Sequence, residues 1–341
     1  MRFVSTDSCP KIKGKYAGFM AELEKLMGRA LFRIFCIKHT IEVHWHRFVK
    51  LRDGLTQGPK TFNGKTCRML EKEDFWKSDI VDFTPIAPNP NVPSIQGISD
   101  ADLKALNNDV QHLLRYYKLV TTGVCVVKPY DSVLNPSGGD LALRFANPGA
   151  LHNARWVTLA NRVLRLYVSQ VEPDEVLVAL VTYVVRIYVP SWIDVIVNGS
   201  ALDAPKVFQR MLSNYDSLVK EGFFRTELEY DHPDDSKKKK DKRRLVSELF
   251  LMERCINQNA FFAHCEPVLV AMLCDAESLA NREKAYETIV LIRKADELRS
   301  EARGRKEIRV FEPPEVNWAV DDYTQFVSFD NPSALTEPPL R

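Results

Sequence analysis

The first fifty residues alternate between short strand-like runs and segments with helical spacing. Residues 3–6 pass from apolar to small polar side chains, and residues 31–35 are mostly apolar, as in a strand covered on both faces. Between them apolar residues recur every three or four positions over 16–27, and Gly28 ends this helix. A second helix follows at 37–51 without a breaker. The pattern predicts strand, helix, strand, helix, with parallel strands joined by a right-handed crossover.

Helical patterns dominate the middle of the chain. Ser99 is a good N-cap for the first of these helices, and Pro173 stands where the third begins. Pro190 is expected to end the third helix, because proline has no backbone N–H to donate. The predicted helices span residues 99–121, 148–168, 174–188, 204–218, 245–256, 267–273 and 281–303.

Four segments show neither the helical nor the strand pattern of apolar residues. Residues 53–63 and 85–97 are dense in glycine, proline or asparagine, which is typical of connectors. Residues 225–244 carry acids and then a block of bases, and such like charges cannot pack, so a mobile surface loop is expected. From residue 311 the chain is rich in proline and aromatic residues, which predicts an extended tail.

These elements predict an α/β fold that is rich in helix. The expected parts are an α/β segment with connectors (1–98), an all-helical block (99–224), a charged loop (225–244), helices that return to the core (245–306) and a tail (307–341).

Composition fits a soluble globular protein. The 341 residues are 45% hydrophobic and 27% charged, which indicates neither a disordered nor a membrane protein. The longest apolar run, 176–189, contains Arg186 and is too short to cross a bilayer, so it predicts a buried helix and no membrane partner. Met1 to Val4 lead into polar residues rather than an apolar leader, so the chain is expected to stay on the cytosolic side.

Cysteine content, net charge and missing motifs reduce the number of function classes that the sequence supports. Seven scattered cysteines, an odd number, favour reduced thiols over a disulfide framework. The net charge of +2 gives no global basic field, although one face can still be basic. The sequence contains no Gly-rich phosphate loop, Gly-x-Ser-x-Gly elbow or Cys-x-x-Cys motif, so nucleotide hydrolysis, ester hydrolysis and thiol exchange have no support.

Cys36 and His39 are the first candidate site. They lie three residues apart at the start of a predicted helix, so their side chains share one face. A structural zinc site would need four ligands, and no second pair of this kind occurs. Packing of a Cys and a His at the strand-helix junction is therefore the preferred interpretation.

Asp7 is the second candidate. An acid at a strand tip is where two-metal phosphoryl-transfer enzymes hold their ions, but a lone Asp at a turn is more often a cap or an Asx turn.

Arg155 and Trp156 are the third candidate, on the best-formed predicted helix. Arg contacts phosphate and Trp stacks on unpaired bases, yet spacing alone favours a buried Trp beside an Arg that reaches solvent. A basic run in the charged loop fits either a nuclear localisation signal, a phosphate-binding patch or a solvated loop. Its members are Lys237, Lys238, Lys239, Lys240, Lys242, Arg243 and Arg244.

Six short motifs, in order over nearly the whole chain, together resemble the RNase H-like core of hAT-type DNA transposases and of transposon-derived animal proteins. They are Ser5–Asp7, Phe35–Thr40, Gly58–Phe62, Pro148–Trp156, Asn259–Glu266 and Thr336–Leu340.

The resemblance implies a mixed sheet flanked by helices, with a long helical insertion, and three acids that hold two Mg²⁺ or Mn²⁺ ions. Asp7 stands at the second acid, where it would bind metal, and Glu266 is assigned to the third. Cys36 and His39 stand at the family's Cys-x-x-His pair. Arg155 and Trp156 stand at the pair that lies near the DNA hairpin end, which makes them DNA-binding together with the basic run.

In this register the first acid and its strands would lie upstream of Met1. The expectation is therefore an incomplete RNase H-like core: a transposase-derived, nuclear remnant without activity or bound metal, which retains DNA binding. The sequence leaves three questions open: whether the chain is an enzyme, whether it forms homo-oligomers, and whether it is cytoplasmic instead of nuclear. The alternative function is a helical protein-interaction module that does not bind nucleic acid.

Overall fold

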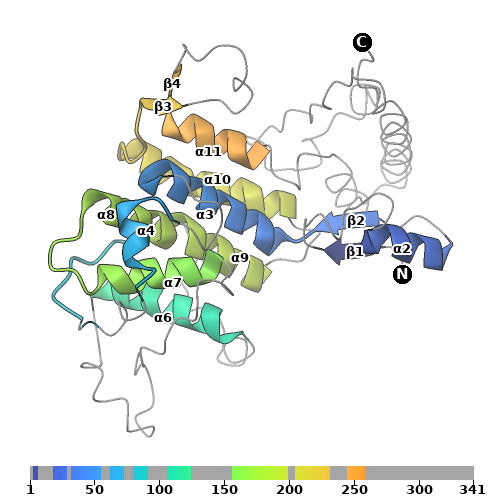
Figure 1. Cartoon of the computed structure of the whole chain (residues 1–341), viewed down its shortest axis with the longest axis horizontal. Helices are drawn as coiled ribbons and strands as arrows, with labels where there is room; N and C mark the ends of the chain where they lie inside the picture. The colour runs from blue at the N-terminus through green and yellow to red at the C-terminus, as the bar shows by residue number, and fades with distance from the viewer. Residues whose placement is uncertain are drawn as a thin grey trace, which may run out of the picture. The chain divides into compact units, whose positions relative to one another are not determined.

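The computed structural model describes residues 3–6, 18–28, 32–54, 62–72, 78, 80–90, 106–123, 156–198, 204–230 and 244–257. This part of the chain is rich in helix (Figure 1). Its helices are α2 (Phe19–Met27), α3 (Ile37–Asp53), α4 (Lys65–Met69), α6 (Asn108–Thr122), α7 (Trp156–Tyr167), α8 (Glu175–Tyr183), the π-helix η5 (Val184–Tyr188), α9 (Val189–Asn198), α10 (Ala204–Lys220) and α11 (Glu248–Asn257). Its strands are β1 (Phe3–Thr6), β2 (Phe32–Phe35), β3 (Leu228–Tyr230) and β4 (Arg244–Val246).

The predicted order strand, helix, strand, helix is confirmed at the start of the chain. β1 and β2 pair in parallel, with Phe3 opposite Phe32 and Thr6 opposite Phe35. Between them lies α2, which ends at Gly28 with a φ of 62°, the left-handed conformation that glycine adopts without strain. β2 is separated from α3 by one residue.

The chain forms two compact units. The first contains residues 1–40, 198–212 and 253–341, and its described elements are β1, α2, β2 and the adjoining ends of α3, α10 and α11. The second contains residues 41–197 and 213–252 and holds the remaining helices and the β3–β4 pair. The predicted domain boundaries at 98/99 and 306/307 lie outside the described residues.

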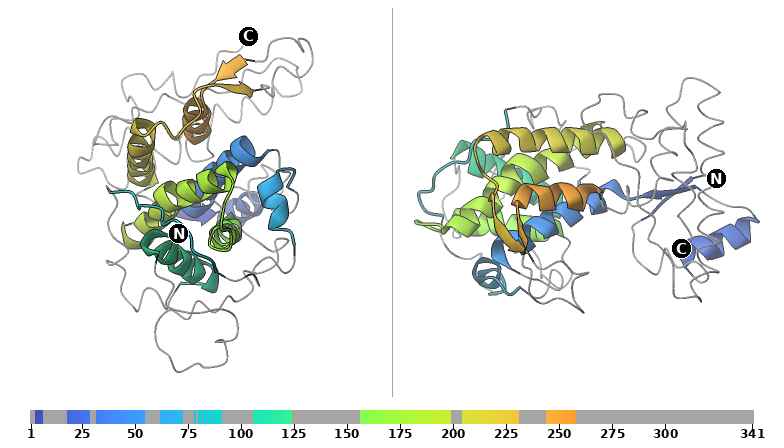
Figure 2. Two further views of the ribbon diagram at one scale, coloured as in Figure 1. Left: turned by 90° about the vertical axis from the view of Figure 1, so that its left-hand side faces the viewer. Right: turned by 90° about the horizontal axis from the view of Figure 1, so that it is seen from above.

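A continuous helix made of α8, η5 and α9 lies at the centre of the second unit (Figures 1 and 2). Its start was correctly predicted: the Asp174 carboxylate accepts the backbone N–H of Leu177 at 2.8 Å. Its end was not, because the helix continues through Pro190 to Asn198. The most apolar 18-residue window of residues 175–196 has a mean hydropathy of 1.8, so by length and composition alone the helix could cross a membrane, which the shorter 176–189 run did not indicate. Because 83% of its most apolar window is buried inside the protein, it has the surroundings of a core helix.

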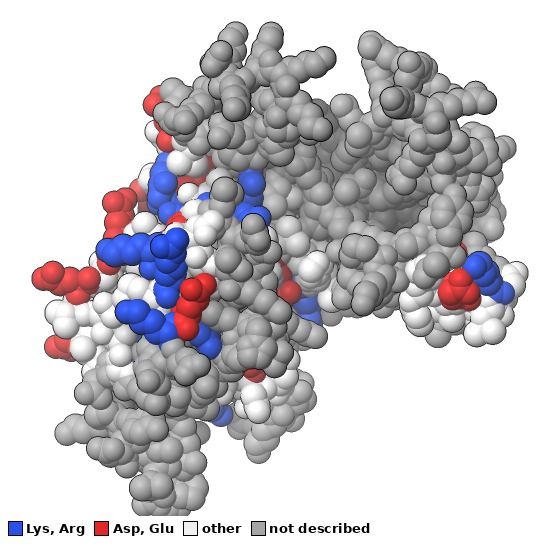
Figure 3. Space-filling view, in the orientation of Figure 1, with Lys and Arg blue, Asp and Glu red and all other residues white. Residues whose placement is uncertain are grey.

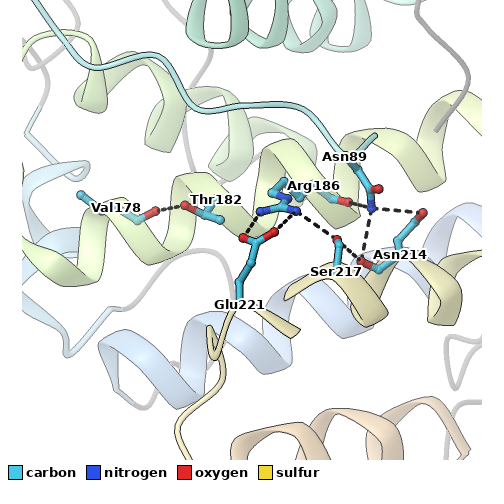
Figure 4. Close-up of polar contacts among 7 residues, drawn as sticks. All are labelled: Asn89, Val178, Thr182, Arg186, Asn214, Ser217 and Glu221. Carbon is cyan, nitrogen blue, oxygen red and sulfur yellow. Dashed lines mark hydrogen bonds and ion pairs between the residues drawn. The ribbon is translucent and has the colours of Figure 1, made fainter. Parts of the chain in front are cut away.

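Asn89 and the π-helix explain why Pro190 does not end the helix. Pro190 has no N–H for the carbonyl of Arg186, four residues earlier. The side-chain amide of Asn89 donates to that carbonyl at 3.3 Å and to the backbone carbonyl of Asn214 at 3.2 Å (Figure 4). The π register also changes the partners, since the N–H of Val189 bonds to the carbonyl of Val184, five residues back. A side chain from a distant segment thus donates to the carbonyl that Pro190 cannot reach.

The guanidinium of Arg186 extends this network to α10. It forms a two-pronged ion pair with the Glu221 carboxylate and also donates to the Ser217 hydroxyl at 3.0 Å (Figure 4). The Glu221 side chain is 54% exposed, and the hydrogen bond and charge of Arg186 lower the pKa of its carboxyl group. At one turn in the centre of the apolar helix, the hydrogen bonds and the ion pair of Arg186 therefore link this helix to the end of α10 and to the extended segment that contains Asn89.

Residues 80–90 form an extended strap, as predicted for the described part of the 85–97 connector. The N–H of Val81 donates to the carbonyl of Val168 just after α7, and that of Ile86 donates to Val120 in α6, both at 3.0 Å. The Tyr167 hydroxyl donates to Thr84 at 2.6 Å. The strap crosses α7, α6 and the central helix, so it holds together elements that the sequence separates widely.

Helix α7 is buried on all sides, including its two arginines. Arg162 and Arg165 are 6% and 1% exposed. Their guanidinium groups donate to the backbone carbonyls of Leu70 and Ser78. Burial lowers the pKa of Arg162. These side chains bind the segment between α4 and the strap to α7, which is a structural role.

Two helix starts differ from prediction. Leu106 and Asn107 are not helical, so an unbroken helix from Ser99 is wrong, and α6 is instead capped by Asn107, whose side chain accepts the N–H of Val110 at 3.1 Å. Helix α11 begins at Glu248 rather than residue 245, because residues 244–246 form β4. In both places a local hydrogen bond or a strand partner overrides the apolar spacing.

Helix α4 was missed, because its cap comes from another helix. The Asp53 carboxylate, at the end of α3, accepts the backbone N–H groups of Thr66 at 3.0 Å and Cys67 at 2.8 Å. Glycine is required at position 64, where the backbone passes close to Asp53, since a Cβ there would lie 1.7 Å from the Asp53 carbonyl oxygen. Five residues with a non-local cap give no helical period to find in a sequence.

The ends of the predicted charged loop pair as a hairpin, which corrects the expectation of an unpaired loop over 225–244. β3 and β4 are antiparallel, with Leu228 opposite Val246 and Tyr230 opposite Arg244. Residues 231–243 between them lie outside the described part of the chain, as do the predicted helices at 267–273 and 281–303 and the tail.

A buried ion pair anchors the base of this hairpin. The Arg52 guanidinium donates to the Glu248 carboxylate at 2.6 Å and to the Phe223 carbonyl at 2.7 Å. The same carboxylate accepts the Arg225 N–H at 3.1 Å. The two side chains are 5% and 0% exposed, and burial lowers the pKa of Arg52 against the opposing effect of Glu248.

Replacing Arg52 with Met should lower the free energy of unfolding by roughly 3–5 kcal/mol, because the Glu248 carboxylate would stay buried without its ion-pair partner. Urea denaturation measures the change. Arg52→Met/Glu248→Met should recover part of the loss, since the double variant leaves no buried charge. The control is Lys25→Gln at the exposed pair with Glu22 (62% and 59% exposed), which should cost no more than about 0.5 kcal/mol. A double variant as unstable as the single one would contradict this account.

Candidate nucleic-acid interface

Three of the candidate residues predicted from the sequence can be placed in detail. Cys36 immediately precedes α3, His39 lies in the first turn of α3, and Trp156 begins α7. Arg244 is the first residue of β4. The other candidates lie outside the described residues: Asp7, Arg155, Glu266, Lys237, Lys238, Lys239, Lys240, Lys242 and Arg243.

The backbone carbonyl of Cys36 accepts hydrogen bonds from the first turn of α3. Its carbonyl accepts the N–H of Thr40 and the Thr40 hydroxyl, each at 3.1 Å. Its side chain is a half-buried free thiol, and His39 is half-buried as well. Among the described residues no group of three His, Cys, Asp or Glu side chains could hold a metal ion. The geometry of Cys36 is that of a residue at a strand-helix junction.

Trp156 is held by α3, the helix that begins with the Cys-x-x-His pair. Its indole ring stacks on the His46 imidazole, with ring centroids 4.0 Å apart and planes inclined by 23°. Its backbone carbonyl accepts the indole N–H of Trp45 at 3.2 Å. Trp156 itself is half-buried. Trp156 is therefore in direct contact with Trp45 and His46, in the part of α3 that belongs to the second unit, whereas Cys36 and His39 belong to the first.

The periodicity of α3 determines which of its side chains reach this surface. Ile41, Trp45 and Phe48 face the core, with exposures of 1%, 0% and 0%. His46 and Lys50, one helical turn apart, are half-buried on a different side of the helix. The buried stripe fixes the rotation of α3, and this rotation turns His46 toward Trp156.

The surface around Trp156 is cationic. Burial lowers the pKa of His46 to about 4, and the positive charges of Lys50 and Arg47 lower it further in the same sense. Burial and Arg47 also lower the pKa of Lys50. At neutral pH the imidazole is therefore uncharged, and Arg47 and Lys50 supply the positive charge.

His44 belongs to the core instead. It is 1% exposed, and burial lowers its pKa to about 3. It is thus a buried neutral imidazole and not part of the surface that carries His46.

The charge on the face seen in Figure 3 is mixed. Lys65, Arg68 and Lys72 are exposed on α4 and the turn after it, with Glu71 exposed among them. Lys65 lies 3.6 Å from the Asp174 carboxylate. These cations are partly balanced by acids, whereas the group on α3 places two cations beside stacked aromatic rings.

This arrangement suits a nucleic-acid strand. Cations contact phosphate groups, and an indole offers a stacking face to an unpaired base. The sequence identified Trp156 but not His46, Arg47 or Lys50, although their spacing on one helix is visible. The missing information was tertiary, because only the packing of α3 on α7 brings His46 to Trp156.

Comparison with protein-family models, curated proteins and solved structures finds no match for this chain.

The two histidines should make the protein less stable as the pH falls. Unfolded histidine takes up a proton near its ordinary pKa of 6.5, whereas folded His46 and His44 do so only at about 4 and about 3. Between those values the unfolded state binds more protons than the folded state. Each unit by which the pH is lowered therefore reduces the free energy of unfolding by at most about 1.4 kcal/mol for each histidine.

Urea denaturation from pH 6.5 to 5 would measure this slope. His46→Gln should reduce it, and Lys118→Gln, at an exposed position on α6, should not. An NMR titration of folded His46 with a midpoint near 6.5 would contradict the expectation.

Proposed function

We propose that this chain is a transposase-derived nuclear protein of RNase H-like type that binds DNA, with the surface around Trp156 as one contact. The family resemblance supplies the class of protein. The order β1, α2, β2, α3 supports it, because the resemblance calls for a strand that ends in an acid and a second strand that runs into the Cys-x-x-His helix. The parallel pairing of the two strands is consistent with such a core.

The contact between Trp156 and α3 is the observation that carries DNA binding. The resemblance places Arg155 and Trp156 near DNA. The stacking of Trp156 on His46 holds its indole beside the cations of α3. A half-buried Trp beside cations would offer both the phosphate and the base contacts that a nucleic acid needs. The basic run from Lys237 to Arg244 extends the same proposal and also suits a nuclear localisation signal.

The proposal includes no strand-transfer activity for the 341-residue chain alone. A two-metal site requires the family's three acids. The resemblance assigns two of them in this sequence, Asp7 and Glu266.

The full chain should bind duplex DNA with an affinity that falls steeply with salt. Fluorescence anisotropy of a labelled duplex with an unpaired overhang, between 50 and 200 mM salt, measures this dependence. Trp156→Ala should weaken binding by roughly fivefold or more, the equivalent of losing about 1 kcal/mol of stacking, and Trp156→Phe should weaken it less. No binding at low salt would reject the proposal and favour a helical protein-interaction module.

A strand-transfer assay with the purified chain, Mn²⁺ and a DNA substrate should give no product. The matched control is Asp7→Ala, which should behave like the unmodified chain. Product from the unmodified chain that disappears in Asp7→Ala would show that the chain is an active transposase.

A further inference from the structure

Three neighbouring side chains of α3 form a group that the sequence alone did not identify. His46, Arg47 and Lys50 are half-buried, and Lys50, four residues after His46 and three after Arg47, lies next to both on the helix surface. His46 is fixed by its stack on Trp156. Among the described residues Lys50 makes no ion pair.

We propose that His46, Arg47 and Lys50 form an anion subsite that holds a phosphate group of a nucleic-acid strand next to Trp156. The inference rests on the proposed DNA binding and adds the phosphate-binding residues of that same surface. The two cations would pair with the phosphate, and the imidazole would lie between them and the indole ring. The ligand class is a phosphodiester, because a stacked aromatic pair beside two cations matches a base and its neighbouring phosphate.

The electrostatics of the group agree with this geometry. Burial is the largest cause of the low pKa of His46, and the charges of Lys50 and Arg47 lower it further; burial and then Arg47 lower the pKa of Lys50. A bound phosphate would offset both repulsions, so its binding should be linked to proton uptake by His46.

The other charged groups near His46 do not change the sign of this effect. On α3, Glu42 lies one turn before His46, is 7% exposed, and its charge acts on the buried Tyr188 hydroxyl. On α7, residues 156–161 carry no charge, and the next charged residue is Arg162.

Two measurements on the full chain test the subsite. In the first, DNA affinity is measured against salt concentration for the unmodified chain, Lys50→Gln and the control Lys118→Gln. Lys50→Gln should reduce the magnitude of the slope of log affinity against log salt by about one, and Lys118→Gln should leave it unchanged. Equal slopes for all three proteins would overturn the subsite.

The second measurement needs no variant of the subsite. The pKa of His46 is followed by NMR with and without the DNA duplex, and with inorganic tripolyphosphate as a ligand that has no bases. Both ligands should raise it above about 4, because a bound phosphate offsets the repulsion by Lys50 and Arg47 although the imidazole stays buried. If DNA binds and the pKa of His46 does not change, the subsite is wrong while the proposed function stands. If tripolyphosphate raises the pKa but DNA does not bind, the anion subsite stands and the proposed function is wrong.

Discussion

The packing of α3 against the central helix controls the second unit. The Phe48 ring stacks on Tyr183 at 4.1 Å, and the Trp45 ring stacks on the same tyrosine at 5.8 Å. Both α3 side chains are fully buried, so α3 cannot rotate without opening the core. In this rotation of α3, His46 stacks on Trp156, Arg52 pairs with Glu248 and Asp53 caps the start of α4. One apolar stripe thus positions an aromatic stack, an ion pair and a helix cap.

The central helix shows how an apolar element can contain a proline and a charged residue. Pro190 removes a donor, and the π turn before it changes the hydrogen-bond register. Asn89 donates to the carbonyl of Arg186, and the Arg186 side chain pairs with Glu221, just after α10. Buried polar groups are tolerated where partners satisfy them, and here the partners come from a strap and a helix that are distant in sequence.

The charges of the second unit fall into two physical classes. Arg52 and Glu248 are withdrawn from water, so their pairing is obligatory once they are buried. Arg47 and Lys50 lie beside the neutral imidazole of His46, and among the described residues Lys50 makes no ion pair. An overall charge of +2 does not reveal this difference, because it depends on where each side chain is placed.

The sequence by itself determined the helical character of the chain, the order of its first four elements and several helix ends. These follow from local causes: apolar spacing along α3, the Asp174 cap and the left-handed Gly28. It also indicated Trp156 as a residue of interest. The tertiary structure alone decided that Pro190 stays inside a helix, that residues 228–230 and 244–246 pair, and that Trp156 meets His46. Each depends on a hydrogen bond or a ring contact between distant segments, and a one-dimensional pattern of apolar and polar residues contains no information about such partners.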